Sequence, residues 1–255
     1  MKNQFTREDV LRPDMSTPFD APLVPSFPFS YRNSEILTLA YRTDPEAIQR
    51  VLPEPLVATS DVVLIHIYRM NDCDWLGVYD EANVMVGAKL PGTDVHGGYS
   101  TALYLSSDGG VAVGREVQGQ PKKAGKVKLR SHGDAWVGRI SRNGIDVVTG
   151  TLAYKQRRAE VESLKQYFDF ALNINLKWIN HIDGRPAIRQ LVARRLEQVK
   201  VHECWSGPCS VELRPNVQAP IFRLPVREML TGFYWRADFT LAGGTIVHDY
   251  LADTN

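Results

Sequence analysis

The middle of this chain is a succession of apolar runs separated by polar turns, a pattern that predicts β-strands. The run over 62–70 is apolar on both faces except at His66 and Arg69, which is typical of a strand enclosed by other elements. Asn143-Gly144 predicts a hairpin between 136–140 and 145–154, since both residue types adopt the positive φ angles of a tight turn. Other strands are predicted over 99–106, 111–117, 127–132 and 135–140, with Gly109-Gly110 as a turn between strands.

Helical patterns are fewer. Asp44-Pro45 predicts the start of a short helix that runs through Leu52 and stops at Pro53. The longest helical pattern covers 159–170, and 226–230 is expected to add one turn. The proline-rich start, about residues 10–30, is predicted to be extended and to wrap a neighbouring subunit. Because no repeat or linker divides the chain, we expect residues 1–255 to form a single α+β domain around an antiparallel sheet.

Composition narrows the classes of protein and partner. Thirty Lys+Arg against 29 Asp+Glu give a net charge of +1, and no segment forms a basic face for nucleic acid. No span is as long as a membrane helix, and Met1–Asp9 lacks the apolar core of a signal peptide, so we expect a cytoplasmic protein without a membrane partner. Three cysteines make no even disulfide framework. The six histidines lie far apart, so neither a metal nor a cofactor is predicted.

The run GREVQGQPKK, from Gly114 to Lys123, carries the most informative chemistry. It places Lys122 and Lys123 side by side after a proline. A lysine ammonium ordinarily titrates near ~10.4, so a lysine nucleophile needs surroundings that destabilise its proton. A second ammonium and an apolar pocket both lower such a pKa. For Pro-Lys-Lys taken alone, a solvated pair in a turn is the simpler interpretation, because paired lysines are common on surfaces.

A series of short segments extends this observation along the chain. They are Ser16-Thr17-Pro18, Tyr41-Arg42-Thr43-Asp44, Leu52-Pro53-Glu54-Pro55-Leu56, Gly114-Arg115-Glu116, Pro121-Lys122-Lys123, Asp183-Gly184, Val201-His202-Glu203, Trp205, Gly207-Pro208, Ala219-Pro220, Leu224-Pro225-Val226 and Asp249-Tyr250-Leu251. No one of them is diagnostic, but in this order and spacing the chain resembles the acetoacetate decarboxylase family from about Ser16 to Leu251. The resemblance implies that the antiparallel sheet closes into a cone-shaped β-barrel with few peripheral helices and with the lysine inside.

The resemblance also implies roles for three side chains. In that family the first lysine of the pair forms an imine, or Schiff base, with a ketone, and the second perturbs it. Lys122 is therefore expected to be the nucleophile and Lys123 its electrostatic partner. A family glutamate follows a Leu-Gly-x-Tyr element, which is Leu76-Gly77-Val78-Tyr79 here, so Glu81 is expected to position a partner or to move protons.

Two family positions are changed in this chain. The family arginine falls on Ser34, which cannot hold a carboxylate through two hydrogen bonds as a guanidinium does. Arg32 would share the face of Ser34 on a strand and so replace the arginine in part. A second family glutamate falls on His66. A proton carrier near neutral pH and a hydrogen-bonded core residue are both open interpretations of this histidine.

Other polar side chains near these motifs are expected to bind substrate. Gln118 would lie on the strand that leads to the lysine turn and donate to a substrate oxygen. Tyr79, Tyr104 and Tyr250 are candidate hydroxyl donors, although a tyrosine taken alone is more often structural than catalytic.

The function favoured by these residues is a Schiff-base lyase that decarboxylates a small β-keto acid similar to acetoacetate through an imine on Lys122. The alternative is an aldolase–dehydratase that condenses a keto acid such as pyruvate with an aldehyde co-substrate through the same imine. It is a serious rival, because the changes at Ser34 and His66 resemble those of such relatives. A third reading is a non-catalytic small-molecule binder, which would need neither Pro-Lys-Lys nor Glu81. The resemblance further implies a homo-oligomer.

Overall fold

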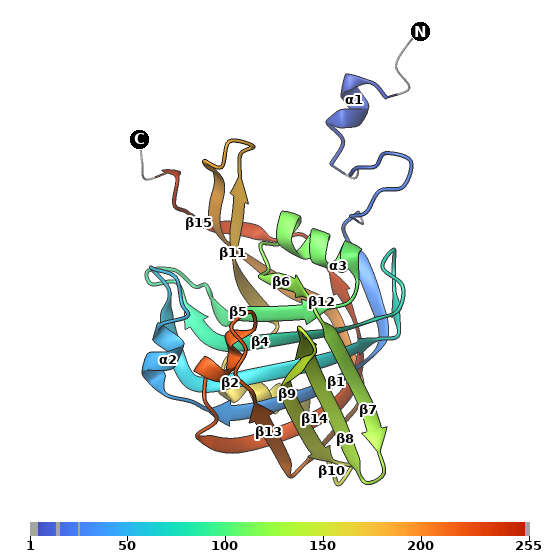
Figure 1. Cartoon of the computed structure of the whole chain (residues 1–255), viewed down its shortest axis with the longest axis vertical. Helices are drawn as coiled ribbons and strands as arrows, with labels where there is room; N and C mark the ends of the chain where they lie inside the picture. Colours follow the sequence, from blue (N-terminus) through green and yellow to red (C-terminus); the bar gives the residue numbers. More distant parts are fainter. Residues whose placement is uncertain (1–4, 14–15, 25, 253–255) are drawn as a thin grey trace.

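The computed structural model describes residues 5–13, 16–24 and 26–252. Within them, seven strands pair in the order β1–β2–β4–β5–β11–β12–β14, and β14 pairs with β1 again, so the sheet closes into a ring (Figure 1). This closure confirms the predicted closed sheet. The ring strands are β1 (Phe29–Arg42), β2 (Val57–Met70), β4 (Tyr79–Lys89), β5 (His96–Leu105), β11 (Leu172–Asn180), β12 (Pro186–Gly207) and β14 (Glu228–Leu241).

Most neighbours in the ring are antiparallel, as predicted, but β5 and β11 run parallel and pair at Asn173↔Gly98 and Ile174↔Tyr99. A parallel pair needs a long connection. The chain supplies one here, because after β5 it forms the lysine segment and most of a second sheet before it returns as β11.

The second sheet has four strands in the order β13–β9–β8–β7 within the described residues, and lies against the outside of the ring (Figure 1). Asn143 and Gly144 join β8 and β9 with φ angles of 54° and 77°, which confirms the predicted hairpin. Its strands are β7 (Lys126–His132), β8 (Ala135–Arg142), β9 (Ile145–Ala153) and β13 (Cys209–Leu213).

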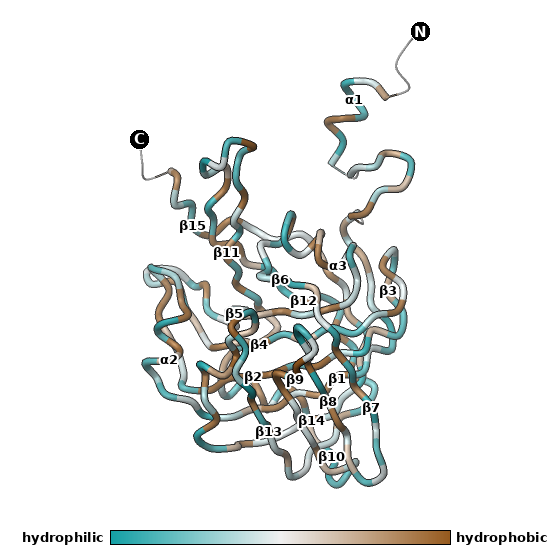
Figure 2. Tube along the Cα trace, viewed as in Figure 1, coloured by the Kyte–Doolittle hydropathy of each residue, from teal (hydrophilic) through white to brown (hydrophobic). Residues whose placement is uncertain are grey.

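Strand alternation gives the ring two apolar faces. Ile65 of β2 and Val84 of β4 face outward and pack with residues of the second sheet such as Ile140. Leu64 of β2 and Met85 of β4 belong to a separate cluster inside the ring. Figure 2 shows the apolar stretches concentrated where the strands of the two sheets come together. The inner cluster leaves room beside it for the polar site described below.

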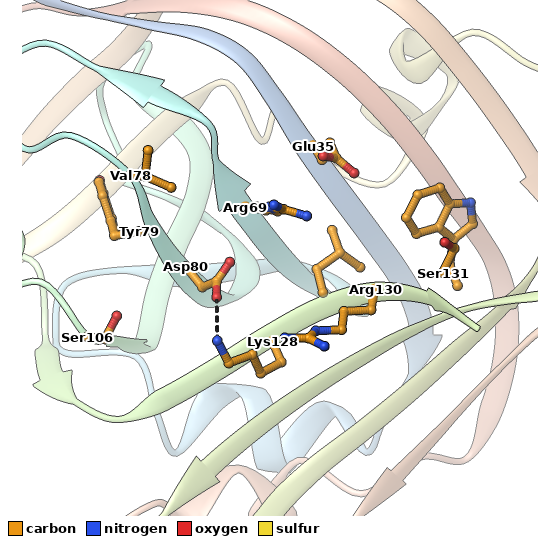
Figure 3. A pocket seen from close by; sticks show the side chains of 11 residues that line it. Glu35, Arg69, Val78, Tyr79, Asp80, Ser106, Lys128, Arg130 and Ser131 are labelled. Carbon is orange, nitrogen blue, oxygen red and sulfur yellow. Dashed lines mark ion pairs between the residues drawn. The ribbon is translucent and has the colours of Figure 1, made fainter.

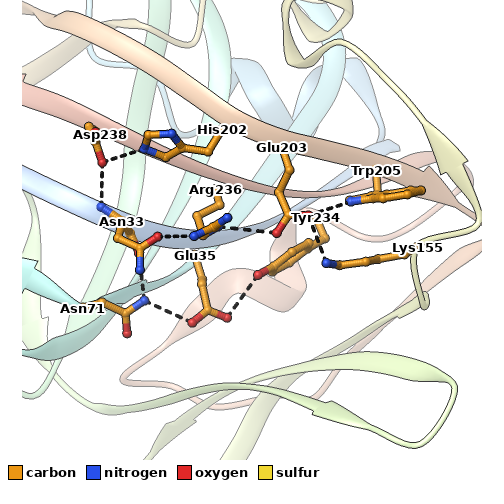
Figure 4. Close-up of polar contacts among 10 residues, drawn as sticks. All are labelled: Asn33, Glu35, Asn71, Lys155, His202, Glu203, Trp205, Tyr234, Arg236 and Asp238. Atoms are coloured by element: carbon orange, nitrogen blue, oxygen red, sulfur yellow. Dashed lines mark hydrogen bonds and ion pairs between the residues drawn. The ribbon is translucent and has the colours of Figure 1, made fainter.

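A polar network joins β12 to β14 and to the turn after β9 (Figure 4). Glu203 accepts hydrogen bonds from Trp205 Nε1 and Lys155 Nζ, each at 2.9 Å, and pairs with Arg236 at 3.4 Å. His202 contacts Asp238 of β14 at 2.8 Å. The segment His202-Glu203 with Trp205 therefore holds together the two strands that close the ring.

Residues 111–117 are helical, so the predicted strand is wrong. They belong to α3 (Asp108–Ala112) and to the π-helix η1 (Val113–Val117), and Gly109-Gly110 lies in α3 rather than in a turn between strands. A short apolar run does not distinguish a strand from a buried helix. The distinguishing signal is Ser107, whose hydroxyl caps the helix by accepting from Gly110 N at 3.1 Å.

Two predicted helices are also wrong. Residues 159–170 form only the 3-10 helix η2 (Val161–Gln166), which buries residues three apart, Val161 and Leu164. Residues 226–230 are not helical, because 228–230 already belong to β14 and Arg227 N, just before them, donates to Arg42 O of β1 at 2.9 Å. The helix predicted from Asp44-Pro45 is confirmed as α2 (Pro45–Gln49), which ends before the expected Leu52.

The other elements are short. The described residues between α1 and β1 contain turns and bends, and this segment leads away from the ring (Figure 1). Residues 14, 15 and 25 of the segment predicted to be extended lie outside the described residues. In the described part of the chain, no helix is both long and apolar enough to cross a membrane. The short elements are α1 (Arg7–Val10), β3 (Asp72–Cys73), β6 (Lys122–Ala124), β10 (Arg157–Arg158), η3 (Pro220–Arg223) and β15 (Thr245–Asp249).

Two glycines that pair across β8 and β9 allow the second sheet to approach the ring closely. A Cβ atom at Gly150 would lie 2.2 Å from Leu39 Cδ1, and one at Gly138 would lie 2.5 Å from Ile67 Cδ1. Leu39 and Ile67 thus occupy the space that a side chain at Gly150 or Gly138 would fill.

We therefore expect Gly150→Ala to lower the free energy of unfolding by about 1–3 kcal/mol, since overpacking a well-packed core costs this much. Urea denaturation measures the change. Gly243→Ala is the matched control, because a Cβ there meets no atom within 4 Å. Equal stabilities of the two variants would contradict this account of the packing between the sheets.

Candidate active site

Lys122 lies inside the ring. It begins β6, pairs with Leu103 of the parallel strand β5, and is only 5% exposed. Its ammonium donates to Glu81 Oε2 at 3.0 Å, and Glu81, on β4, is 7% exposed. A charge taken out of water costs several kcal/mol unless a partner of opposite charge is placed beside it. The lysine and the glutamate provide that partner for each other.

A cavity of about 50 Å³ reaches this ion pair. Since a single water takes ~10–15 Å³ on the same measure, the cavity has room for about four waters. Much of its wall is apolar, which limits the water that can surround the pair. The apolar lining residues are Met70, Met85, Phe170, Leu196, Phe239 and Leu241.

The segment from η1 to β6 holds Lys122 in place. Arg115 Nη1 donates to Lys122 O at 3.1 Å, and Gln120 N donates to Gly114 O at 2.8 Å. A Cβ atom on Gly114 would lie 2.3 Å from Lys122 Cδ. Glycine at this position therefore leaves the space through which the lysine side chain reaches Glu81.

Lys123 points away from the cavity. It is exposed, and its ammonium donates to Gln218 O at 3.1 Å. Because successive residues of a strand point to opposite faces, Lys122 and Lys123 cannot both enter the ring. The structure does not bring the two amines into one cavity, so the predicted electrostatic effect of Lys123 would have to act across the strand.

Neither Ser34 nor Arg32 lines the cavity. Ser34 is fully buried, and its hydroxyl has no partner among the described residues. Arg32 is exposed and pairs with Asp72 and Asp74 at 3.3 and 2.8 Å. The pairing of β1 with β14 shifts register between Tyr31 and Ser34, which breaks the alternation of side chains. The expectation that Arg32 replaces the family arginine is therefore wrong.

His66 is a buried residue of β2 that shares a face with Glu81 but does not line the cavity. Its Nδ1 atom lies 2.9 Å from the hydroxyl of Thr38, which accepts from Trp235 Nε1 at 2.9 Å. Burial lowers the pKa of His66 to about 3, so the ring is neutral near pH 7. Of its two interpretations, this geometry favours the hydrogen-bonded core residue.

The other predicted substrate-binding residues lie outside the cavity wall. Gln118 directly follows η1 and lines a separate pocket. The hydroxyl of Tyr79 lies 2.9 Å from that of Tyr31, which does line the cavity, and burial raises the pKa of both phenols. Tyr104 packs in the outer cluster, and Tyr250 donates to a backbone carbonyl in the loop before β2.

Sequence reasoning missed the polar part of the wall. Asn173 Nδ2 donates to Ser100 Oγ at 2.8 Å, and Gln120 Nε2 contacts Asn173 Oδ1 at 3.4 Å. Asn83 and Arg194 complete this side of the cavity. The spacing of Asn173 and Asn175, two positions apart among the apolar residues Leu172, Ile174 and Leu176, places both on one face of the strand and is the signal in the sequence. The sequence holds no comparable signal for Arg194, because its neighbours on the long strand β12 are a buried alanine, Ala193, and an exposed arginine, Arg195.

A larger pocket of about 590 Å³ lies outside the ring, between β4 and the second sheet (Figure 3). Its charged groups include Asp80 and Lys128, which pair at 3.5 Å, and Arg130. Neither Lys122 nor Glu81 reaches it. The smaller inner cavity is therefore the candidate active site. Among the described residues, no group of three or more His, Cys, Asp and Glu side chains is placed to hold a metal ion.

A family model described as acetoacetate decarboxylase matches residues 15–251 of this chain. The chain is 38% identical to the acetoacetate decarboxylase of Bordetella avium, over 92% of this chain and 94% of that protein. It is also 38% identical to that of Chromobacterium violaceum, over 98% and 99% of the two chains. The chain belongs to the acetoacetate decarboxylase family.

Solved structures agree with this family membership. The acetoacetate decarboxylase of Legionella pneumophila superimposes with a TM-score of 0.86 at 31% identity, over 98% of this chain and 99% of that one. MppR, an enduracididine biosynthesis enzyme solved with pyruvate, gives a TM-score of 0.76 at 18% identity, over 92% and 96% of the two chains, and so shares the fold. The acetoacetate decarboxylase relatives support an enzyme of the lyase class, a decarboxylase.

Because a Cβ atom at Gly114 would overlap Lys122 Cδ, we expect Gly114→Ala to displace the lysine side chain from Glu81. A misplacement of about 1 Å at a reacting group can lower a rate about 100-fold. We expect the rate of borohydride trapping of a ketone on Lys122 to fall by this order, while circular dichroism shows a folded protein. Trapping at the wild-type rate would mean that the glycine does not position the lysine.

Burial of neutral His66 predicts a pH dependence of stability. Below about pH 6.5 the unfolded chain binds a proton at this histidine, whereas the folded chain does not until about pH 3. The free energy of unfolding should therefore fall as the pH drops through this window. His66 contributes up to about 1.4 kcal/mol to this fall for each pH unit. Urea unfolding at pH 7, 6 and 5 should give a shallower decline for His66→Met than for the wild type. Parallel declines would show that His66 takes up its proton in the folded state.

Proposed function

We propose that this protein is a Schiff-base decarboxylase of a small β-keto acid, with Lys122 as the nucleophile and Glu81 as its proton partner. The observation that carries the proposal is the 3.0 Å contact between these two buried side chains at the end of a small cavity. The acetoacetate decarboxylases that are 38% identical over nearly the whole chain support the same reaction class.

The reaction can be written with these residues alone. The Lys122 ammonium passes a proton to Glu81, and the free amine attacks the ketone carbon of the substrate. Loss of water, helped by the proton on Glu81, leaves an iminium. Its nitrogen accepts the electron pair of the bond to the carboxylate carbon, so that carbon dioxide leaves and an enamine remains. Protonation of the enamine carbon and addition of water release the ketone and restore Lys122.

The apolar side chains of the wall assist the bond-breaking step. Phe170, Leu196 and Phe239 cannot hydrogen-bond to a carboxylate and leave little room for water around it, so the charged group is poorly hydrated there. Carbon dioxide is neutral and loses nothing in such surroundings. A dry wall also keeps water from the enamine until its carbon has been protonated.

An aldolase–dehydratase remains the alternative, because the same iminium can lose a proton instead of carbon dioxide and then attack an aldehyde. MppR, solved with the condensation product of pyruvate and imidazole 4-carboxaldehyde, has this fold. The changes at Ser34 and His66 favour this alternative. The volume of the cavity favours decarboxylation, since room for about four waters suits one small keto acid better than a keto acid together with an aldehyde. A homo-oligomer and a cytoplasmic location remain predictions.

Borohydride trapping tests the proposal. Incubation with acetoacetate and borohydride should leave an acetone-sized adduct on Lys122, read by intact mass and peptide mapping. Lys122→Ala should abolish both the adduct and turnover, and Glu81→Gln should lower kcat about 10²- to 10⁴-fold, the usual contribution of a general acid–base group. Lys123→Gln is the matched comparison and should keep the adduct, because its amine lies on the other face of β6.

Three other outcomes would change the assignment. A pyruvate adduct that keeps its carboxylate, without an adduct from acetoacetate, would indicate the aldolase–dehydratase. Turnover by Lys122→Ala would exclude imine chemistry at this residue. The absence of any adduct in the wild type would contradict both lyase reactions and favour a binding protein. Preformed acetone serves as the control for spontaneous decay of acetoacetate.

A further inference from the structure

Arg194 of β12 is a charged side chain in the wall of the Lys122 cavity. The negative charge of Glu81 acts on it, but Glu81 is paired with Lys122 and makes no hydrogen bond to Arg194. Its Nε and Nη1 atoms are buried without a hydrogen bond, and no ion pair among the described residues reaches the guanidinium. Nη2 makes no hydrogen bond among the described residues either, but it is not fully buried and so keeps accessible surface. An arginine stays protonated in proteins, and a buried charge left unpaired costs several kcal/mol. Such a cost is offset when an anion occupies the cavity.

The next residue, Arg195, has the exposed position that is usual for an arginine. Arg195 points to the opposite face of β12, is exposed, and pairs with Asp169 at 2.7 Å. Arg194 shares its face with Leu196, which also lines the cavity. Because side chains alternate along β12, the guanidinium of Arg195 lies beside a surface carboxylate and that of Arg194 lies in the cavity of Lys122.

Arg194 also lines a second pocket, whose wall includes neither Lys122 nor Glu81. This pocket has a volume of about 290 Å³, and its wall includes Arg194, Lys177 of β11 and Gln118. This wall holds two cations and no carboxylate among the described residues. Both polar atoms of the Gln118 amide are buried without a partner. The wall is therefore suited to attract an anion and to offer it hydrogen bonds.

We propose that Arg194 binds the carboxylate of the keto-acid substrate and that the pocket beside it is the entrance to Lys122. The inference rests on the proposed imine chemistry at Lys122. A guanidinium can give a carboxylate two parallel hydrogen bonds, which Ser34 cannot do. Arg194 thus supplies from β12 the positive charge that the serine on β1 lacks, and it selects acids over neutral ketones.

The kinetic signature of this role follows from the loss of charge during the reaction. The carboxylate is fully charged when the substrate binds and loses its charge as carbon dioxide leaves. Its contact with Arg194 is therefore stronger in the bound substrate than in the transition state. An interaction of this kind lowers KM without raising kcat.

Arg194→Met should raise KM for acetoacetate about 10- to 100-fold, the usual effect of losing a hydrogen bond to a charged group, and leave kcat within a few-fold of the wild type. Trapping of neutral acetone on Lys122 should be unchanged. The melting temperature should stay the same or rise, because an unpaired buried charge is removed. Arg194→Lys, which keeps the charge but not the paired donors, should give an intermediate KM.

Arg195→Met is the matched control: it removes the same charge from the next residue of the same strand, and KM should not change. An unchanged KM in Arg194→Met would overturn the proposal. Loss of acetone trapping in that variant would overturn it too, since it would show that Arg194 shapes the lysine site rather than binds a carboxylate.

A measurement without imine formation separates this proposal from the proposed function. In a Lys122→Ala background, acetoacetate or pyruvate should still raise the melting temperature, and the added Arg194→Met change should remove that rise. A rise in both proteins would exclude Arg194 as the carboxylate partner. Loss of the rise with Arg194→Met, in a protein whose wild type forms no adduct, would support the binding role and contradict the decarboxylase.

Discussion

The buried ion pair between Lys122 and Glu81 is the constraint on which the rest of the structure depends. Two charges remain stable inside a protein only if their partners are fixed, so the strands that carry them cannot shift. Strand pairing fixes them, because β4, which carries Glu81, and β6, which carries Lys122, both pair with β5. Glu203 and its contacts strengthen the closure where β12 meets β14. The same enclosure keeps the cavity small and therefore restricts the substrate to a small molecule.

Strand alternation decides which of several similar side chains can take part in the chemistry. Lys122 and Lys123 are neighbours with the same functional group, yet only the first faces Glu81. Arg194 and Arg195 divide in the same way on β12. On β1 the irregular pairing before Ser34 sends Arg32 to surface aspartates. In this fold, the face of the strand on which a side chain lies decides its role as much as its residue type does.

Local pattern predicted the parts of the fold that depend on local interactions. The strand at 62–70 and the Asn143-Gly144 hairpin follow from residue periodicity and turn chemistry, and both are present. The apolar run at 111–117, which belongs to α3 and η1, fits a strand as well as a helix, and only the Ser107 cap distinguishes them. Arg194 could not be found in this way, because its place beside Lys122 depends on how β12 pairs with β11 and β14, about 70 residues further along the chain than the lysine.

Charge balance links these observations to turnover. Lys122 and Glu81 together are neutral, so with Arg194 as the carboxylate partner the empty site carries one uncompensated positive charge. Under the proposed function, binding of a keto acid would neutralise that charge, whereas a neutral ketone of the same size would not. After loss of carbon dioxide, the remaining ketone would have no charge and would leave Arg194 without an anion. The site would then prefer a new substrate anion to its own product, so the same guanidinium that selects the acid would also favour release of the ketone.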